Sequence, residues 1–99
     1  MRPPIQPHLG TFGLGFAIDQ LKSGRWLRRA NWPLAEFLFL EDHPIIRLTG
    51  ENAGLRGAPV HQAICLHTAE GEIIVGWTPT QADMLSSDWQ YYEKPESAR

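Results

Sequence analysis

GWTPTQADMLSSDW, residues 76–89, is the stretch from which we interpret the rest of the chain. The apolar run 73–75 leads into it and predicts a strand that Pro79 helps to end. Thr80 is then a candidate N-cap, because its hydroxyl can accept a backbone N–H in the first turn of a helix. Asp83 lies three residues later, in the capping-box position. The stretch therefore predicts a strand, a turn and one short helix before the chain extends again.

This arrangement indicates a ligand site or a packed turn. The indole of Trp77, at the end of a strand, could stack on a base, and the helix start could receive a polar or anionic group. The alternative is that Trp77 and Trp89 are core residues around a tight turn. Spacing alone favours this second interpretation.

Composition limits the classes of function. The chain has 99 residues, 42% of them hydrophobic, which predicts one small globular domain. Four Trp are more than such a core needs, so some should line an interface or a ligand site. The net charge of −2 argues against a broad electrostatic grip on nucleic acid, although a few Arg could still hold one phosphate ligand. The single Cys65 excludes an intrachain disulfide and indicates a reducing, cytosolic setting.

Periodicity predicts the remaining elements. Apolar residues at helical spacing indicate a helix of two to three turns within residues 12–24, and Gly24 suits the position after its C-cap. Strands are expected at residues 25–32, 36–41, 62–68, 72–77 and 89–92, with a further short one possible at 45–48 and a surface loop at 51–59. The predicted fold class is α+β: an N-terminal helix, an antiparallel sheet of about five strands, and a short helix before the last strand. We expect a single domain over residues 12–93, a flexible N-terminal arm at 1–11 and a frayed tail at 94–99.

The first predicted strand carries three Arg within five residues. Alternation places Arg29 and Asn31 on one face, and Arg28 and Trp32 on the other. Arg interleaved with aromatics would suit a pyrophosphate-bearing nucleotide. The alternative is a solvated edge strand whose Arg stems cover apolar surface.

Enzyme and metal signals are weak. His61 and His67 would lie about 20 Å apart along a strand, too far to bind one ion, so we expect no metal site and no cofactor. The chain has no Gly-rich phosphate loop after a strand and no nucleophile-elbow Ser. Cys65 is interpreted as a buried hydrophobe rather than a nucleophile. A binding protein, not an enzyme, is the expected class.

The order of motifs resembles the second Thoeris anti-defence family over about residues 12–92. The matching motifs are Phe12-Gly13, Ala17-Ile18, Leu21-Lys22-x-Gly24, Arg29-x-x-Trp32, Phe37-Leu38, Thr68-Ala69-x-Gly71 and Trp77-x-x-Thr80-Gln81-x-Asp83-x-Leu85-x-x-Asp88-Trp89. The last of these motifs is the most specific.

The resemblance implies a small phage-encoded sponge protein. Such proteins bind signalling nucleotides of bacterial immune enzymes and hold them without cleavage. The implied ligands are glycocyclic ADP-ribose isomers and, for some members, cyclic dinucleotides. The implied assembly is a homotetramer with ligands at subunit interfaces, in the cytoplasm of the infected bacterial host.

The resemblance also implies a set of ligand-binding residues. Six match the family's motifs, and Asn31 takes a position where the family usually has Gly; the set is Arg29, Asn31, Trp32, Trp77, Thr80, Gln81 and Asp83. The Trp rings would stack on bases, Arg29 would bind phosphate, and Asp83 would accept a hydrogen bond from an adenine amino group. Pro33 departs from the family pattern, in which Asn often follows the Trp.

Two further interpretations stay open. Arg28, Arg56 and His61 could contribute to a second pocket for cyclic dinucleotides, or could simply form solvated surface. The exposed aromatics would equally suit a phage structural or adaptor module that binds another protein.

Overall fold

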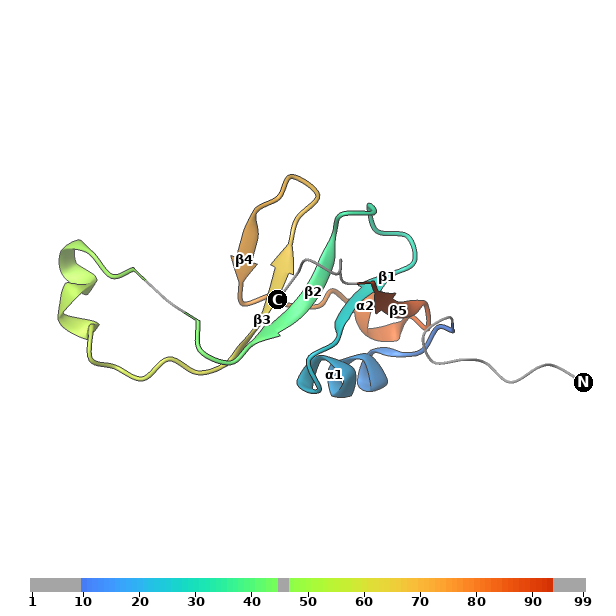
Figure 1. Ribbon diagram of the computed structural model, residues 1–99, viewed down its shortest axis with the longest axis horizontal. Coiled ribbons are helices and arrows are strands. Elements are labelled where there is room, and N and C mark those ends of the chain that lie inside the picture. Colours follow the sequence, from blue (N-terminus) through green and yellow to red (C-terminus); the bar gives the residue numbers. More distant parts are fainter. Residues whose placement is uncertain (1–9, 45–46, 94–99) are drawn as a thin grey trace, which may run out of the picture.

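The computed structural model describes residues 10–44 and 47–93 (Figure 1). The elements are α1 (Leu14–Lys22), β1 (Trp26–Arg29), β2 (Phe37–Glu41), the 3₁₀ helix η1 (Gly50–Leu55), β3 (Ala63–His67), β4 (Ile73–Val75), α2 (Gln81–Leu85) and β5 (Trp89–Tyr92). The predicted α+β fold is thereby confirmed. The predicted N-terminal arm, up to residue 9, and the predicted tail lie outside the described residues.

The sheet is antiparallel throughout and has the strand order β4-β3-β2-β1-β5. Two pairs of neighbours, β1 with β2 and β3 with β4, follow each other directly in the chain. Residues 30–36 connect the first pair and residues 68–72 the second, and Gly71 has a positive φ of 88°. The last strand returns to pair with β1, where Trp26 lies opposite Tyr92.

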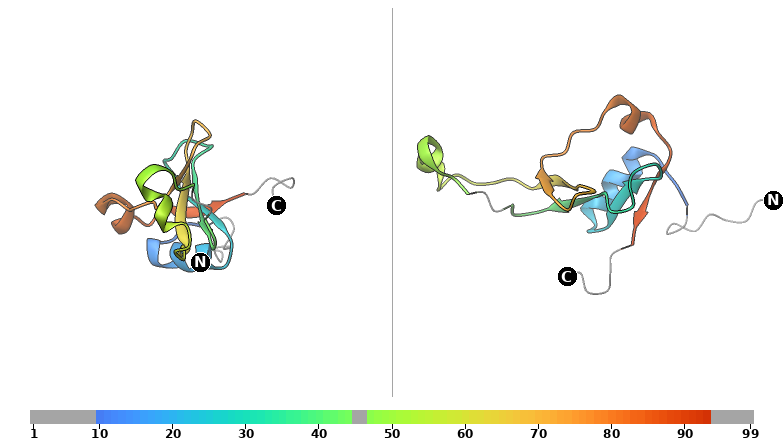
Figure 2. Two further views of the ribbon diagram at one scale, coloured as in Figure 1. Left: turned by 90° about the vertical axis from the view of Figure 1, so that its left-hand side faces the viewer. Right: turned by 90° about the horizontal axis from the view of Figure 1, so that it is seen from above.

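The helix α1 covers one face of this sheet (Figure 2). Ala17 and Leu21, four residues apart on α1, are 0% and 1% exposed, because they pack on Leu27 and Leu38 of the two central strands. Trp89 at the start of β5 joins the same core and is 0% exposed. The core therefore forms between α1 and the middle of the sheet.

The opposite face carries a second, aromatic cluster. Phe37 of β2 stacks on Trp26 at 4.3 Å and on His67 at 4.7 Å between ring centroids. Tyr92 also stacks on Phe37, at 4.3 Å. These contacts leave Phe37 only 6% exposed, although none of the helices in the described part of the chain covers this face. Alternation along β2 thus places Leu38 in the core under α1 and Phe37 on the opposite, aromatic face.

The first strand is shorter than predicted, and this changes the place of Trp32. The strand β1 ends at Arg29, and a hydrogen bond from Trp32 N to the Arg29 carbonyl closes a turn. The turn breaks the alternation, so Trp32 packs against the core on the α1 face and not on the face of Trp26. The expectation that Trp32 and Arg28 share a face was therefore wrong.

Residues 47–62, which we call the arm, connect β2 to β3 and project from the body (Figure 1). The predicted surface loop at 51–59 lies here and contains most of η1. Ile45 and Ile46 of the possible strand at 45–48 lie outside the described residues, and Arg47 and Leu48 belong to no strand. The structure thus joins β2 to β3 by a long connection, in which the sequence analysis had considered an additional short strand.

Two glycines give a matched test of the backbone at the end of α1. Gly24 has a φ of 93°, whereas Gly15 lies inside α1, and a Cβ at either position would meet no atom within 4 Å. We expect Gly24→Ala to lower the free energy of unfolding by roughly 1 kcal/mol, because an L-residue is strained in that region. We expect Gly15→Ala to raise it by about 0.5–1 kcal/mol, because Ala loses less entropy in a helix.

Urea unfolding of the two variants beside the wild type measures both changes. Equal effects of the two substitutions would show that Gly24 has no special backbone role.

Candidate functional site

The short helix α2 begins with the predicted capping box. The Thr80 hydroxyl accepts a hydrogen bond from the Asp83 N–H at 3.1 Å, and Oδ2 of Asp83 accepts one from the Thr80 N–H at 2.9 Å. These reciprocal bonds satisfy backbone donors that a helix start otherwise leaves without partners. The N-cap role inferred for Thr80 is confirmed.

Arg29 of β1 holds this helix start against the sheet. Its Nη1 donates to Oδ1 of Asp83 at 3.1 Å, and its Nε donates to Oδ1 of Asp88 at 2.9 Å. Its Nη2 donates to Oγ of Ser86 at 2.6 Å. The side chains of Arg29 and Asp83 are only 13% and 10% exposed, so solvent weakens this pair less than it would at the surface.

The electrostatics of the network follow from these contacts. The hydrogen bond that Arg29 donates to Asp88 is the largest cause that raises the pKa of Arg29 above its ordinary value, and the bond that it donates to Asp83 adds to it. Burial acts in the opposite direction. Arg29 therefore stays charged, with most of its donors directed at protein acceptors.

Three indoles meet beside this network. Trp89 donates from Nε1 to the Asp83 carbonyl at 2.9 Å and is fully buried. Trp32 and Trp77 lie edge-on to Trp89, with centroids 5.4 and 5.9 Å from it, and 6.3 Å from each other. Both keep part of their surface exposed. The core interpretation thus holds for Trp89, whereas Trp32 and Trp77 are half-buried.

The predicted site also includes three polar residues that lie within four positions of Trp32 or Trp77 in the sequence. Asn31 precedes Trp32 in the turn after β1 and is exposed. Thr80 and Gln81 open α2 and are exposed as well. The structure joins Arg29 and Asp83 directly, and it brings Trp32 to Trp77.

The residues suggested for a second pocket do not come together within one protomer. Arg28 lies in β1, where its guanidinium donates to the carbonyls of Trp32 and Pro33 while its Nε is buried without a hydrogen-bond partner. Arg56 and His61 lie on the arm, away from β1 (Figure 1). Arg56 donates to the Leu48 carbonyl at 3.3 Å.

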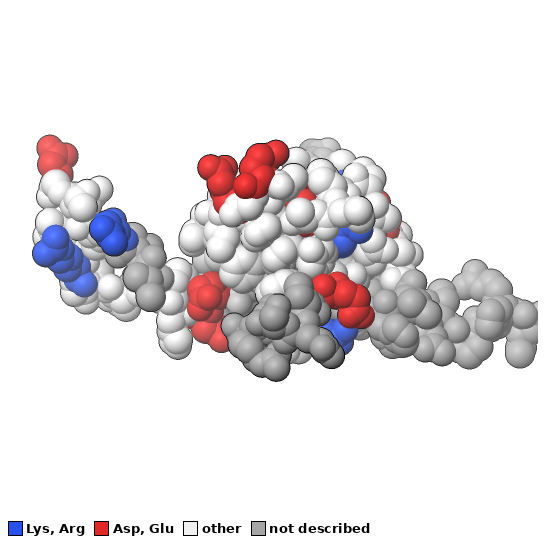
Figure 3. Space-filling model, turned by 45° about the horizontal axis from the view of Figure 1, so that its top comes forward, with Lys and Arg blue, Asp and Glu red and all other residues white. Residues whose placement is uncertain are grey.

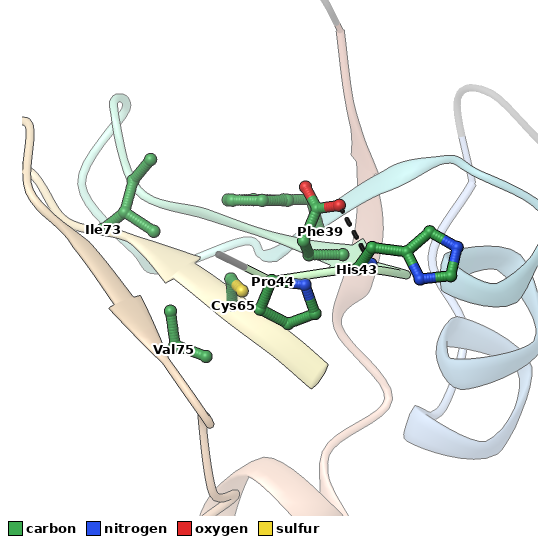
Figure 4. Close-up of a pocket in the computed structure, with 7 residues that line it drawn as sticks. Phe39, His43, Pro44, Cys65, Ile73 and Val75 are labelled. Atoms are coloured by element: carbon green, nitrogen blue, oxygen red, sulfur yellow. Dashed lines mark hydrogen bonds between the residues drawn. The ribbon is translucent and has the colours of Figure 1, made fainter. Parts of the chain in front are cut away.

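A hollow on the aromatic face was not anticipated. It has a volume of about 240 Å³ and is lined by Phe39, Glu41, His43, Pro44, Cys65, Ile73 and Val75. Ile73 and Val75 form one side of it, and Phe39 and Pro44 lie across from them (Figure 4). Strand alternation could have placed Phe39, Cys65 and Val75 in one row, but the sequence carries no signal that Pro44 folds back over them.

Cys65 at the base of this hollow is 1% exposed, as expected of a buried hydrophobe. Burial is the main cause that raises the pKa of its thiol, and the charge of Glu41 adds to it. The neutral thiol is therefore favoured.

Among the described residues, no three His, Cys, Asp or Glu side chains are grouped as metal ligands would be. None of the helices described is long and apolar enough to span a membrane.

Comparison with known families gives one match. Residues 12–92 match the family model of the Thoeris anti-defense 2-like domain. The matched range begins two residues before α1 and ends with β5, so it includes all the elements described above. A search of curated proteins finds no match.

Removal of the Asp83 carboxylate tests the network. Asp83→Ala deletes a helix cap and a charge-assisted hydrogen bond to Arg29, so we expect the free energy of unfolding to fall by about 2 kcal/mol. Gln81→Ala, in the same helix but exposed, should change it by less than about 0.5 kcal/mol. Thermal or urea unfolding measures both variants. An Asp83→Ala protein that unfolds like the wild type but loses ligand affinity would instead place Asp83 in direct contact with the ligand.

Proposed function

The chain belongs to the Thoeris anti-defense 2-like family, whose role is to counter Thoeris defence, and from this premise we propose that it sequesters a cyclic nucleotide signal without cleaving it. The proposed ligands are the glycocyclic ADP-ribose isomers of Thoeris, and the proposed place of action is the cytoplasm of the infected bacterial host. The protein acts as a stoichiometric binder in this proposal, with no catalytic step.

The observation that supports this proposal is the pair of half-buried indoles, Trp32 and Trp77, held edge-on against the buried Trp89. A ring that is fixed from behind and open in front loses little conformational freedom when a base stacks on it. The exposed polar side chains of Asn31, Thr80 and Gln81 supply hydrogen-bonding groups near these rings in sequence. Planar stacking with a few polar contacts is how proteins commonly hold a nucleotide base.

Arg29 and Asp83 have a different part in the proposed site. Each oxygen of Asp83 already accepts a hydrogen bond, from Arg29 or from the Thr80 N–H. A carboxylate oxygen retains a further lone pair, so Asp83 can still accept a hydrogen bond from an adenine amino group. We therefore assign Asp83 and Arg29 first to the positioning of α2, and to ligand contact through the capacity that remains.

Cyclic dinucleotides are a second proposed ligand class. Arg28 belongs to the body of the protomer, and Arg56 and His61 belong to the arm. A pocket that uses all three would have to form between subunits. This proposal therefore requires an assembly and has no counterpart in the single protomer.

Ligand recovery tests sequestration. Incubation with glycocyclic ADP-ribose followed by heat denaturation should return the ligand intact, measured by chromatography and mass spectrometry. A cleaved product would contradict the proposal and indicate a hydrolase. At a hundred times its dissociation constant, the ligand should also stabilise the fold by about 2.7 kcal/mol.

Trp77→Ala is the matching variant. Loss of a base stack should weaken affinity roughly tenfold to a hundredfold. Leu85→Ala removes a side chain that is 83% exposed on α2 and serves as the control with unchanged affinity. If no glycocyclic or cyclic nucleotide shifts the melting temperature, the alternative of an adaptor that binds another protein is favoured. The exposed apolar side chains of β4 would suit that alternative as well.

A homotetramer with ligand at the subunit interfaces is the proposed assembly. The protomer supports it by exposing large apolar side chains at several places, including Ile73, Val75 and Leu55. Light scattering at micromolar concentration should report four times the protomer mass. A monomer would remove the interfacial ligand site from the proposal.

A further inference from the structure

The connection between β1 and β2, residues 30–36, carries Trp32 of the candidate site. The N–H of Ala30, its first residue, donates to the Asp88 carbonyl at 3.0 Å. Connecting loops are usually more mobile than the strands they join. A ring on such a loop keeps one orientation only if the backbone that carries it is held. The contacts made by the carbonyls of this connection therefore matter for Trp32.

Arg28 of β1 binds the middle of the connection. Its Nη2 donates to the carbonyl of Trp32 and, at 3.3 Å, to the carbonyl of Pro33. Hydrogen bonds from a charged donor are stronger than those between neutral groups. The Nε of Arg28 is buried without a hydrogen-bond partner, at a cost in free energy that a solvated side chain would avoid. The guanidinium is therefore held at the connection and is not a freely solvated cation.

His67 binds the same connection from β3. Its Nδ1 lies 2.9 Å from the carbonyl of Ala35. A carbonyl can only accept, so Nδ1 carries the proton and donates it. The imidazole also stacks on the buried ring of Phe37, with centroids 4.7 Å apart. Stacking fixes the plane of the imidazole, so its N–H is directed at the Ala35 carbonyl without much loss of freedom.

Both donors lie on the aromatic face of the sheet, whereas the indole of Trp32 packs on the other face. Alternation along β1 places Arg28 on the face of Trp26, which stacks on Phe37. The indole of Trp32 packs on the α1 side, with its centroid 5.4 Å from that of Trp89. The connection is thus bonded through its backbone on one face and packed through its ring on the other.

We propose that Arg28 and His67 are positioning residues for ligand binding, which fix the carbonyls of the connection and so hold Trp32 in the orientation in which a base stacks on it. The assignment rests on the proposed function, because it concerns a ring of the same site. It goes beyond that function by giving a part in binding to two residues that need not touch the ligand.

Direct contact with a ligand phosphate is the alternative role for Arg28. On the face of the body that Figure 3 shows, the described Lys and Arg side chains occupy only small, separate areas. That face has no broad cationic surface, among the residues described, of the kind that gathers anionic ligands. The bonds to the two carbonyls therefore favour the positioning role.

Calorimetric titration with glycocyclic ADP-ribose tests the part of Arg28. Arg28→Met keeps an apolar stem but removes every donor, so affinity should weaken roughly threefold to tenfold, the cost of ordering a loosened loop on binding. Arg28→Lys retains a charged donor and should recover most of that loss. Lys22→Ala is the control, because it removes one exposed positive charge at the end of α1 and should leave affinity unchanged.

The part of His67 has its own pair of variants. His67→Phe keeps an aromatic ring to stack on Phe37 but loses the donor, so affinity should weaken about threefold. His67→Asn can donate from nearly the position of Nδ1 and should bind more tightly than His67→Phe. The reverse order would show that the ring, and not the hydrogen bond, is what matters.

A double-mutant cycle separates positioning from direct contact. In a Trp32→Ala background the ring that Arg28 positions is absent, so Arg28→Met should weaken affinity by less than about twofold further. Equal losses in the two backgrounds would place Arg28 on the ligand itself and overturn the proposal.

Fluorine NMR of protein labelled with 5-fluorotryptophan tests the same contacts without ligand. The chain has four Trp, and Trp32→Phe identifies the resonance of Trp32. Arg28→Met and His67→Phe should each shift or broaden that resonance, whereas Lys22→Ala should leave all four unchanged. A residue that only stabilises the fold would lower the melting temperature without altering the resonance.

The two kinds of measurement fail in different ways. An unchanged Trp32 resonance in the folded variants, checked by circular dichroism, would overturn the positioning role. If Arg28→Met does not fold, Arg28→Lys and His67→Phe take its place in the NMR comparison. A wild type that binds no nucleotide would contradict sequestration, while the NMR comparison would still decide whether Arg28 and His67 hold the ring.

Discussion

The guanidinium of Arg29 is the group on which the arrangement of the site depends. It joins β1 to the start of α2 through Asp83, to the end of that helix through Ser86, and to the segment before β5 through Asp88. A largely buried ion pair adds little net stability compared with apolar packing, because both charges lose water. Its effect here is directional, since the planar fork of Arg29 accepts only one placement of α2 against the sheet.

That placement explains how a fold with a small core keeps two indoles partly open. The Asp83 backbone carbonyl accepts the indole N–H of Trp89, so the fully buried ring is satisfied by the same residue that caps the helix. Trp89 then forms a rigid surface behind Trp32 and Trp77. The helix cap, the ion pairs and the three indoles are thus linked through Asp83, and a substitution that removes the cap should also change the positions of the indoles.

Local features of this chain could be predicted from sequence, and long-range ones could not. The Thr80–Asp83 cap, the role of Gly24 and the strands β2 and β3 each depend on neighbours within a few residues. The partners of Arg29 are 54 to 59 positions away, so no spacing rule identifies them. Trp32 was placed on the wrong face because the turn after Arg29 ends the strand three residues early. The surface loop at 51–59 was expected, but the full extent of the arm was not, because a short apolar run at 45–48 suggested a strand. The family resemblance located candidate residues without their contacts.

The return of β5 to β1 has a consequence for how the fold forms. The β1–β2 and β3–β4 hairpins close short loops, whereas the pairing of Arg29 with Trp89 joins distant parts of the chain. Closing such a loop costs entropy before any contact compensates for it. We expect the two hairpins to form early and the strand that carries the largest buried side chain to dock last. The rate of folding would then be limited by the entropy of closing the long loop between β1 and β5, after the two hairpins have formed.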